Sequence, residues 1–356
     1  MRDLTHNYKG LKVLVTGSTG FKGCWLSFWL NKMGARVIGV ALKPEKNSIL
    51  FKELKLEKKI KQYITNIQNF EKINQIVKRE KPDIIFHLAA QSIVSLSYKK
   101  PLETFKTNAI GSANILESFR LNKIPNIVYI TSDKCYLNLD TKKSYTEKDR
   151  LGGFDNYSSS KASAELIFNS YFKSYFNINK RFLNVASARA GNVIGGGDMK
   201  ENRLIPDTIK SINKGTNLKI RSPNSTRPWQ HVLEPISGYL ILGQKLMNKK
   251  LKSSIDPSWN FGPEKKNCKT VINVTKNILK EWGSKKKISL NKSKMYESKF
   301  LSLNINKAKK ELKWKPKLNF NETIRFTVDW YKNFLINKKN IVSLTSSQID
   351  YYINKK

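Results

Sequence analysis

The sequence predicts an α/β fold in which a doubly wound parallel sheet is combined with a smaller, interleaved domain. Short, branched apolar runs alternate with helix-length segments through the first half of the chain. A glycine-rich turn, Gly17 to Gly23, follows the first apolar run and begins the first helix. After Gly191 this alternation stops, so we expect the second half to form a different, smaller unit.

The first half is expected to contain six strands. Residues 11–16 (LKVLVT) form an apolar run ending in glycines, which is typical of a buried parallel strand. A helix follows over 21–33 and ends at Gly34, because glycine readily takes the left-handed conformation that closes helices. The other expected strands are 36–42, 63–65, 83–88, 126–131 and 183–188. Three more helices are expected: one that follows the third strand and ends near residue 79, one at 104–121 and one at 154–175. Such alternation implies right-handed crossovers.

The second half has a less regular pattern. We expect a loop at 195–198, helices at 204–213, 271–282 and 306–312, a turn-rich basic segment at 223–235, and a strand at 259–262 returning to the main sheet. This divides the chain into residues 1–190 (with the returning strand near 258–262), 191–337, and a peripheral tail, 338–356.

Composition excludes several classes of protein. Of the 356 residues, 39% are hydrophobic, which is ample for a buried core. No apolar run approaches the roughly 18 residues that span a bilayer, and the N-terminus lacks a signal peptide. The three cysteines are widely separated, which argues against a disulfide framework and against a zinc site. We therefore expect a cytoplasmic protein without a membrane anchor or a metal.

The net charge of +39 would by itself suggest a nucleic-acid or membrane partner. Only 11 of the 66 basic residues are arginine, however, and the lysines are scattered along the chain. That distribution is typical of solvated surface lysines, so we expect no nucleic-acid partner. A positive field would still attract an anionic substrate.

The turn at Gly17, Gly20 and Gly23 has the spacing G-x-x-G-x-x-G, one residue different from the dinucleotide fingerprint. Glycines let the backbone approach a pyrophosphate, and the helix N-terminus supplies free N–H groups. The second strand runs into Ala41-Leu42-Lys43-Pro44, without the acid that would hold a ribose 2′-hydroxyl. Because Lys43 could instead favour a 2′-phosphate, NAD and NADP both remain open.

Tyr157 and Lys161, in the segment DNYSSSKASAE, are spaced one helical turn apart on one face. The lysine cation can lower the phenol's pKa from about 10, giving a base that works near neutral pH.

Together with His87-Leu88-Ala89-Ala90-Gln91, Thr107-Asn108 and Thr131-Ser132-Asp133-Lys134, these motifs resemble the extended short-chain dehydrogenase/reductases that act on nucleotide sugars. These are Rossmann-fold, NAD-dependent epimerases and dehydratases. The segments GSTGFKGCWLSFWL, TSDKCY, LGGFDNYSSSK, ASARAGNVIGGGD, RLIPD and TRPWQHVLEP narrow the resemblance to 4,6-dehydratases that take CDP-activated glucose. The resemblance covers residues 8–320 or thereabouts.

The resemblance implies a hydro-lyase that oxidises the sugar at C4, eliminates water across C5 and C6, and returns the hydride to C6. It implies that Tyr157 takes the 4-hydroxyl proton, that Lys161 also binds the nicotinamide ribose, and that Ser132 bonds the 4-oxygen. Asp133 would be the acid for the departing 6-hydroxyl. Lys134 would be either the C5 base or a cation stabilising the enolate.

The resemblance also implies binding residues. For the cofactor they are Gly17, Thr19, Gly20, Phe21, Lys22, Gly23, Asn66, Ile67, Leu88, Ala89, Ala90, Gln91, Asn108, Tyr157 and Lys161. For the substrate they are Asn192, Arg203, Leu204 and Arg227, whose guanidinium forks suit a diphosphate. The family commonly forms homodimers or homotetramers.

The sequence departs from the family's motifs at two places, and two alternative functions remain open. Asn66-Ile67-Gln68-Asn69 stands where the family has Asp-Ile-Arg-Asp, and Ser95 replaces a usual basic residue. A dehydratase or 4-epimerase for another nucleotide sugar is one alternative. The other, a Rossmann regulator or nucleic-acid binder, would not need all of Ser132, Tyr157 and Lys161.

Overall fold

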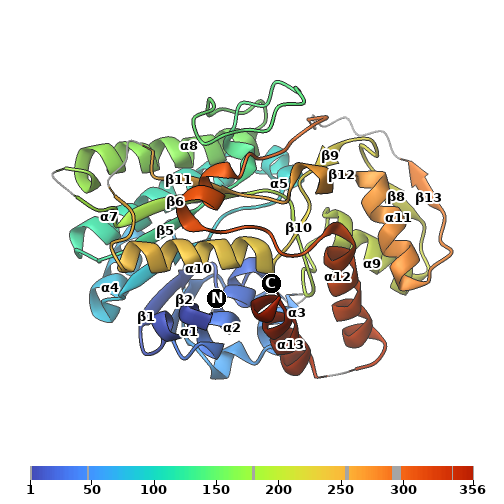
Figure 1. Ribbon diagram of the computed structural model, residues 1–356, viewed down its shortest axis with the longest axis horizontal. Coiled ribbons are helices and arrows are strands. Elements are labelled where there is room, and N and C mark those ends of the chain that lie inside the picture. The colour runs from blue at the N-terminus through green and yellow to red at the C-terminus, as the bar shows by residue number, and fades with distance from the viewer. Residues whose placement is uncertain are drawn as a thin grey trace.

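The protein is organised around one seven-stranded parallel sheet (Figure 1). The structure, a computed structural model, describes residues 2–45, 48–178, 181–252, 256–290, 298–338 and 340–355. The strand order is β11-β6-β5-β4-β1-β2-β3. The strands are β1 Lys12–Thr16, β2 Arg36–Ala41, β3 Lys61–Ile64, β4 Ile84–His87, β5 Ile127–Ile130, β6 Val185–Ala190 and β11 Ser258–Phe261. The chain thus fills one half of the sheet outward from β1 and then returns to build the other half, as a doubly wound fold does.

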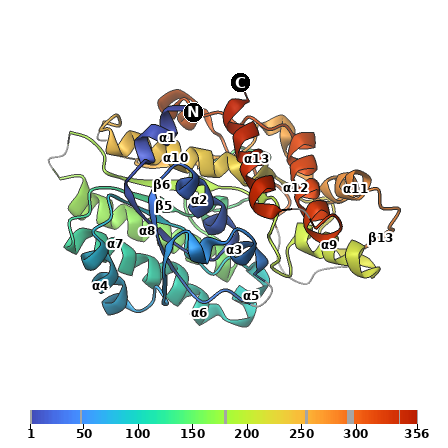
Figure 2. The same cartoon turned by 90° about the horizontal axis from the view of Figure 1, so that it is seen from below.

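Helices cover both faces of this sheet (Figure 2). On one face α4 (Phe70–Glu80), α7 (Gly111–Leu121) and α8 (Asn156–Tyr171) pack side by side. On the other, α10 (Leu233–Met247) contacts β5, β6, α1 (Arg2–Tyr8) and α2 (Phe21–Lys32). Because both faces are covered, the central strands β4 and β5 are buried along their whole length, which explains their continuous apolar sequences.

Short helices connect these layers. They are α3 Ile49–Glu53, α5 Val94–Lys99, α6 Pro101–Phe105, and the π-helical turns Lys106–Ile110 and Phe172–Phe176. The first π-helical turn joins α6 to α7, and the second extends α8 at its C-terminus.

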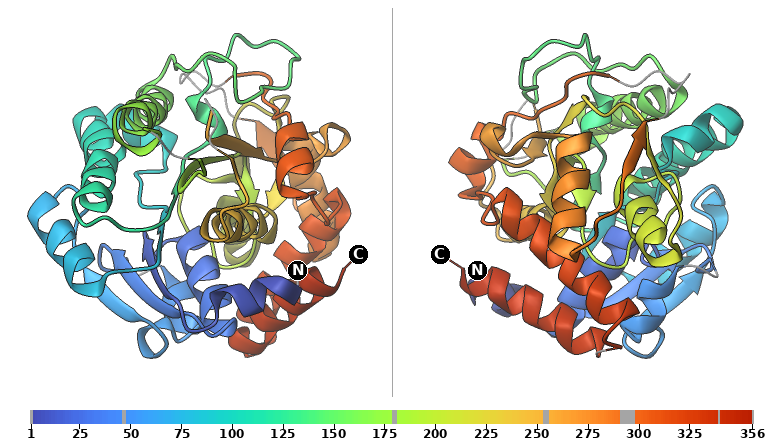
Figure 3. Two further views of the ribbon diagram at one scale, coloured as in Figure 1. Left: turned by 60° about the vertical axis from the view of Figure 1, so that its left-hand side comes forward. Right: turned by 90° about the vertical axis from the view of Figure 1, so that its right-hand side faces the viewer.

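The smaller unit lies beside the carboxyl ends of the strands (Figure 3). Its helices are α9 Leu204–Lys214, α11 Val271–Trp282 and α12 Phe320–Leu335. Three two-stranded pairings hold it together: β7 (Val193–Ile194) with β10 (Gln230–His231), β8 (Leu218–Ile220) with β13 (Ile288–Leu290), and β9 (Thr226–Arg227) with β12 (Lys269–Thr270). β11 lies in the main sheet, so the two units interleave as expected.

The expected α/β fold is confirmed, with differences at the ends of elements. The sixth strand lies at 185–190 rather than 183–188, and α1 was not expected. The helix expected at 306–312 contains a π-helical turn, Ala308–Leu312.

The expectation of a peripheral tail is wrong for most of residues 338–356. Ile341–Asn354 forms α13, which packs against α12, and its Ile341, Ile349 and Tyr352 are buried. The Tyr352 hydroxyl donates to Glu234 Oε2 of α10 at 2.6 Å. Residues 339 and 356 lie outside the described residues. These apolar side chains recur at helical spacing and give α13 a buried face. The prediction of a peripheral tail was based on the Lys, Asn and Ser content and overlooked this spacing.

Candidate active site

A cavity of about 600 Å³ opens where the strands of the main sheet end and the smaller unit begins. Ligands bind at this position in open α/β sheets. Residues expected from the sequence to act in catalysis or binding line it from both sides. They are Gly17, Thr19, Gly20, Phe21, Lys22, Gly23, Asn66, Ile67, Leu88, Ala89, Ala90, Ser132, Asp133, Lys134, Tyr157, Lys161, Asn192, Arg203, Leu204 and Arg227.

The glycine turn fits a dinucleotide for steric reasons. Gly17 has φ +72°, and a Cβ there would lie 2.9 Å from the backbone nitrogen of Ala89. A Cβ on Gly23 would lie 2.0 Å from the Gly17 carbonyl oxygen. α2 begins at Phe21, and its N-cap, Gly20, supplies no side-chain cap. The N–H groups of the first turn are therefore left for an anionic group, as a pyrophosphate requires.

The segment that replaces Asp-Ile-Arg-Asp is shaped by its two asparagines. Asn66 Oδ1 accepts from the Gln68 backbone N–H at 3.0 Å, and Asn69 Oδ1 caps α4 by accepting from Lys72 N–H at 2.9 Å. Asparagine thus reproduces the turn and the cap without a negative charge.

Gln91 and Asn108 do not line the cavity, although we expected both to bind the cofactor. Asn108 Oδ1 accepts from the Gln91 N–H at 2.8 Å, and its Nδ2 donates to the Gln91 carbonyl and to Ser160 Oγ. These contacts hold the loop after β4 against α8. In this structure Asn108 therefore supports the site from behind.

The expected catalytic residues meet at the junction of β5 and α8. Ser132 Oγ donates to Asp133 Oδ1 at 3.0 Å. Asp133 is 2% exposed, and its Oδ2 has no hydrogen-bond partner among the described residues. Burial raises the pKa of Asp133. The Lys134 cation, the hydrogen bond between Asp133 and Ser132, and the Arg227 cation lower it. A buried carboxyl group with a raised pKa is suited to donating a proton.

The expected effect of Lys161 on Tyr157 is not what the structure shows. Burial and the Asp133 carboxylate raise the pKa of Tyr157 to about 12, although a hydrogen bond with Ser132 lowers it. Burial and the nearby Lys22 cation lower the pKa of Lys161 to about 7. The Lys161 ammonium lies 6.0 Å from the centre of the Tyr157 ring. The helical spacing is as predicted, but burial is the largest influence on both side chains and disfavours both charged forms.

Lys22 contributes a side chain that the sequence analysis treated only as part of the glycine turn. It is half-buried, and desolvation together with the Arg203 cation lowers its pKa to about 8, while Asp133 raises it. Three of the lysines that line the cavity, Lys22, Lys134 and Lys161, are thus among the expected site residues, together with the buried carboxyl group of Asp133.

On the substrate side, Arg203 connects the two units. Its Nη1 donates to Asp198 Oδ2 at 2.8 Å and its Nη2 donates to Ser92 Oγ at 2.6 Å. Arg227 lies on β9 and is 5% exposed. The guanidinium groups of both residues thus lie at the cavity wall, as an anionic substrate requires.

Sequence reasoning missed other lining residues, chiefly Asp198, Arg221 and Trp229. Trp229 is 6% exposed, and its Nε1 donates to the Lys269 carbonyl at 2.9 Å. The turn GGGD carried a signal for Asp198, since an acid five residues before Arg203 is placed to pair with it.

This fold and site define a class of protein. Residues 14–327 match the sequence profile of the GDP-mannose 4,6-dehydratase family. The chain therefore belongs to that family, among the short-chain dehydrogenase/reductase enzymes that modify nucleotide sugars.

Individual proteins in the comparisons are similar to this chain over nearly its whole length. CDP-glucose 4,6-dehydratase of Salmonella typhimurium is 40% identical over 349 residues, covering 97% of each chain. The crystal structure of a dTDP-glucose 4,6-dehydratase from Bacillus anthracis, in complex with NAD, is 26% identical with a TM-score of 0.76, over 91% of this chain and 97% of that one. UDP-glucose 4-epimerase of Thermotoga maritima shares the fold, with a TM-score of 0.79 at 22% identity over 91% of this chain and all of that one.

Within the described residues, no helix combines the length and the apolar character needed to cross a membrane.

Proposed function

We propose that this chain converts CDP-glucose to CDP-4-keto-6-deoxyglucose and water. The observation that carries the proposal is the turn Ser132–Asp133–Lys134, which lies in the same cavity as Tyr157 and Lys161. Oxidation at C4 needs only the tyrosine, lysine and serine. The acid and the cation beside them are suited to the further step, loss of water across C5 and C6.

The glycine turn supports a nicotinamide dinucleotide, and NAD is the one present in the related Bacillus anthracis structure. The turn and the start of α2 would hold its pyrophosphate, and Lys161 would hold the ribose next to the nicotinamide. When bound, NAD supplies the acceptor that takes the hydride from C4 and gives it back at C6. The carboxyl end of β2 reaches Leu42 and Lys43 at the cavity wall, so the ribose 2′-position has no carboxylate from that strand end.

The chain's own residues divide the proton transfers. Tyr157, in its phenolate form, takes the proton of the sugar's 4-hydroxyl and becomes the neutral phenol, and Ser132, hydrogen-bonded to it, orients the same oxygen. Asp133 gives its proton to the departing 6-hydroxyl, which leaves as water. Lys134 lies beside Asp133 and serves at C5, as the base or as the cation that stabilises the enolate. Arg203 and Arg227 hold the diphosphate.

A panel of activated hexoses tests this proposal. The protein is incubated with CDP-, TDP-, UDP- and GDP-glucose, and the 4-keto sugar is followed by its absorbance in alkali. We expect turnover of CDP-glucose with loss of water, seen as a mass decrease of the product. Turnover of another nucleotide sugar alone would refute the choice of CDP-glucose, and an epimer of unchanged mass would refute dehydration.

We infer that two copies associate through the outer face of α6, α7 and α8. The exposed apolar residues there are Leu102, Ile110, Leu166 and Tyr175. These helices contact one another, so exposed apolar side chains on them offer a surface for association. Sedimentation should give a dimer or a tetramer, and a monomer at micromolar concentration would refute the inference.

A further inference from the structure

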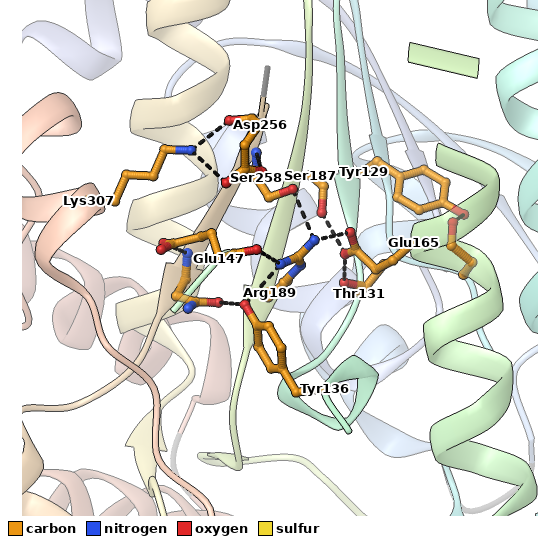
Figure 4. A network of polar contacts seen from close by, with 12 residues as sticks. Tyr129, Thr131, Tyr136, Glu147, Glu165, Ser187, Arg189, Asp256, Ser258 and Lys307 are labelled. Atoms are coloured by element: carbon orange, nitrogen blue, oxygen red, sulfur yellow. Dashed lines mark hydrogen bonds and ion pairs between the residues drawn. The ribbon is translucent and has the colours of Figure 1, made fainter. Parts of the chain in front are cut away.

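The proposed catalytic groups lie on two separate elements. Ser132, Asp133 and Lys134 follow β5, in the segment from Thr131 to Tyr136 that we call the catalytic turn. Tyr157 and Lys161 lie on α8. Proton transfer between a tyrosine and a sugar requires the two elements to stay in register within a fraction of an ångström. Figure 4 shows a buried network that joins them.

Glu165 is the member of the network on α8. It follows Lys161 by four residues and Tyr157 by eight, so it extends the same face of the helix inward. Its carboxylate accepts from Arg189 Nη2 at 2.7 Å, from Ser187 Oγ at 2.6 Å and from Thr131 Oγ1. Thr131 is the first residue of the catalytic turn.

Arg189, on β6, holds the other end of that turn. Its Nη1 donates to the Tyr136 hydroxyl at 2.9 Å and to the Glu147 carbonyl at 3.1 Å, and its Nη2 donates to Ser258 Oγ at 3.1 Å. Tyr136 closes the catalytic turn, and its hydroxyl donates to Asn260 Oδ1 on β11 at 2.7 Å. One ion pair thus fastens both ends of the turn to α8 and to the sheet.

We propose that the buried Glu165–Arg189 pair is a positioning device, which sets the catalytic turn against Tyr157 and Lys161 for proton transfer. The proposal rests on the proposed function for the reaction itself. Its geometric basis is independent of the reaction. Thr131 reaches the cavity wall, but its Oγ1 bonds Glu165, and neither Glu165 nor Arg189 lines the cavity.

The pair also acts on Lys161 electrostatically. Both side chains are buried, with Arg189 1% exposed and Glu165 fully enclosed. Burial raises the pKa of Glu165, but Arg189 and the Ser187 and Thr131 hydroxyls lower it further, so Glu165 carries its charge. The groups facing Lys161 are Lys22 on α2, Cys135 on the catalytic turn, His87 on β4, and Tyr157 and Glu165 on α8. Glu165 is the fixed anion among them, and it helps Lys161 to stay protonated.

Two hydroxyl deletions test the positioning. Thr131→Val and Ser187→Ala each remove one donor to Glu165 Oε1, but only Thr131 belongs to the catalytic turn. We expect Thr131→Val to lower kcat about tenfold with KM for CDP-glucose changed less than about twofold, because a lost hydrogen bond shifts the turn without altering substrate contacts. Ser187→Ala should keep kcat within about twofold. Equal effects on kcat would overturn the proposal.

Glu165→Gln tests the electrostatic part. It should move the alkaline fall of kcat to lower pH, because loss of the anion favours neutral Lys161. The matched control is Glu80→Gln, which removes another buried carboxylate, one bonded to Lys61 and Tyr63 at the far edge of the sheet. Its profile should keep the wild-type position, and an unshifted profile for Glu165→Gln would contradict the electrostatic role. Inactive wild type would refute the proposed function instead.

Discussion

Tyr157 illustrates at the scale of one residue how burial controls reactivity. Its hydroxyl is held near Ser132 in a buried site, so the phenol stays protonated until a proton acceptor or a neighbouring positive charge favours the phenolate. Tyr157→Phe should therefore lower kcat by about a thousandfold, the range for loss of a general base, while substrate affinity changes little. Calorimetric titration with CDP-glucose checks the affinity. A variant that keeps a tenth of the activity would show that another group takes the proton.

Lys134 is the residue on which the outcome after C4 oxidation depends. Lys134 follows Asp133 directly in the sequence, and its cation lowers the pKa of the Asp133 carboxyl group. Lys134→Ala should still oxidise C4 slowly, with accumulation of reduced cofactor and about a hundredfold less elimination. The near-ultraviolet absorbance of the reduced nicotinamide reports the first step. Lys142→Ala, an exposed lysine in the following loop, is the control, and normal dehydration by Lys134→Ala would refute its role.

At the scale of elements, the start of α2 depends on closely packed backbone. An alanine Cβ at position 23 would lie 2.0 Å from the Gly17 oxygen, and one at position 20 would lie 3.2 Å from the same atom. Gly23→Ala should thus cost about 3 kcal/mol of stability and abolish cofactor binding, whereas Gly20→Ala should cost less than about 1 kcal/mol. Urea unfolding and cofactor titration of both variants check this order. Equal losses would mean that the two glycines are needed for conformation and not for space.

The elements also show what sequence patterns can predict. Apolar runs and glycines located the strands and α2, because each pattern is local. Asn108 was assigned to the cofactor from its motif, yet its partners Gln91 and Ser160 lie 17 and 52 residues away. The network of Glu165 and Arg189 likewise joins residues 24 positions apart and has no local signature. Long-range polar contacts of this kind cannot be predicted from spacing along the chain.

At the scale of the whole molecule, α13 is tied to α10, which packs on the main sheet, through Glu234. Burial raises the pKa of this carboxyl group to about 7, although donors from Tyr352, Leu318 and Lys317 lower it. A folded-state pKa above the ordinary value of 4.5 gives stability that is fully present below pH 4.5 and lost as pH rises through 7.

Relative to Glu234→Gln, the wild type should lose about 3 kcal/mol of unfolding free energy between pH 4.5 and pH 8, since each unit of pKa shift corresponds to about 1.4 kcal/mol. Urea unfolding of both proteins across this range checks the slope. Parallel curves would show that Glu234 is ionised at little cost in the folded state.

The sequence by itself determined the parallel α/β fold and the glycine turn, and nearly all the site residues that it predicted line the cavity, because these depend on local patterns and on motifs read in order. Only the tertiary structure decided how the site is charged. It buries Tyr157 and Lys161 and places Lys22 and Asp133 near them, so that desolvation and neighbouring like charges shift the pKa values of Tyr157 and Lys161 in a way that helical spacing alone did not predict. It also made the tail part of the core and joined Glu165 to Arg189 behind the site. Burial is a property of the assembled chain, which is why it could not be predicted residue by residue.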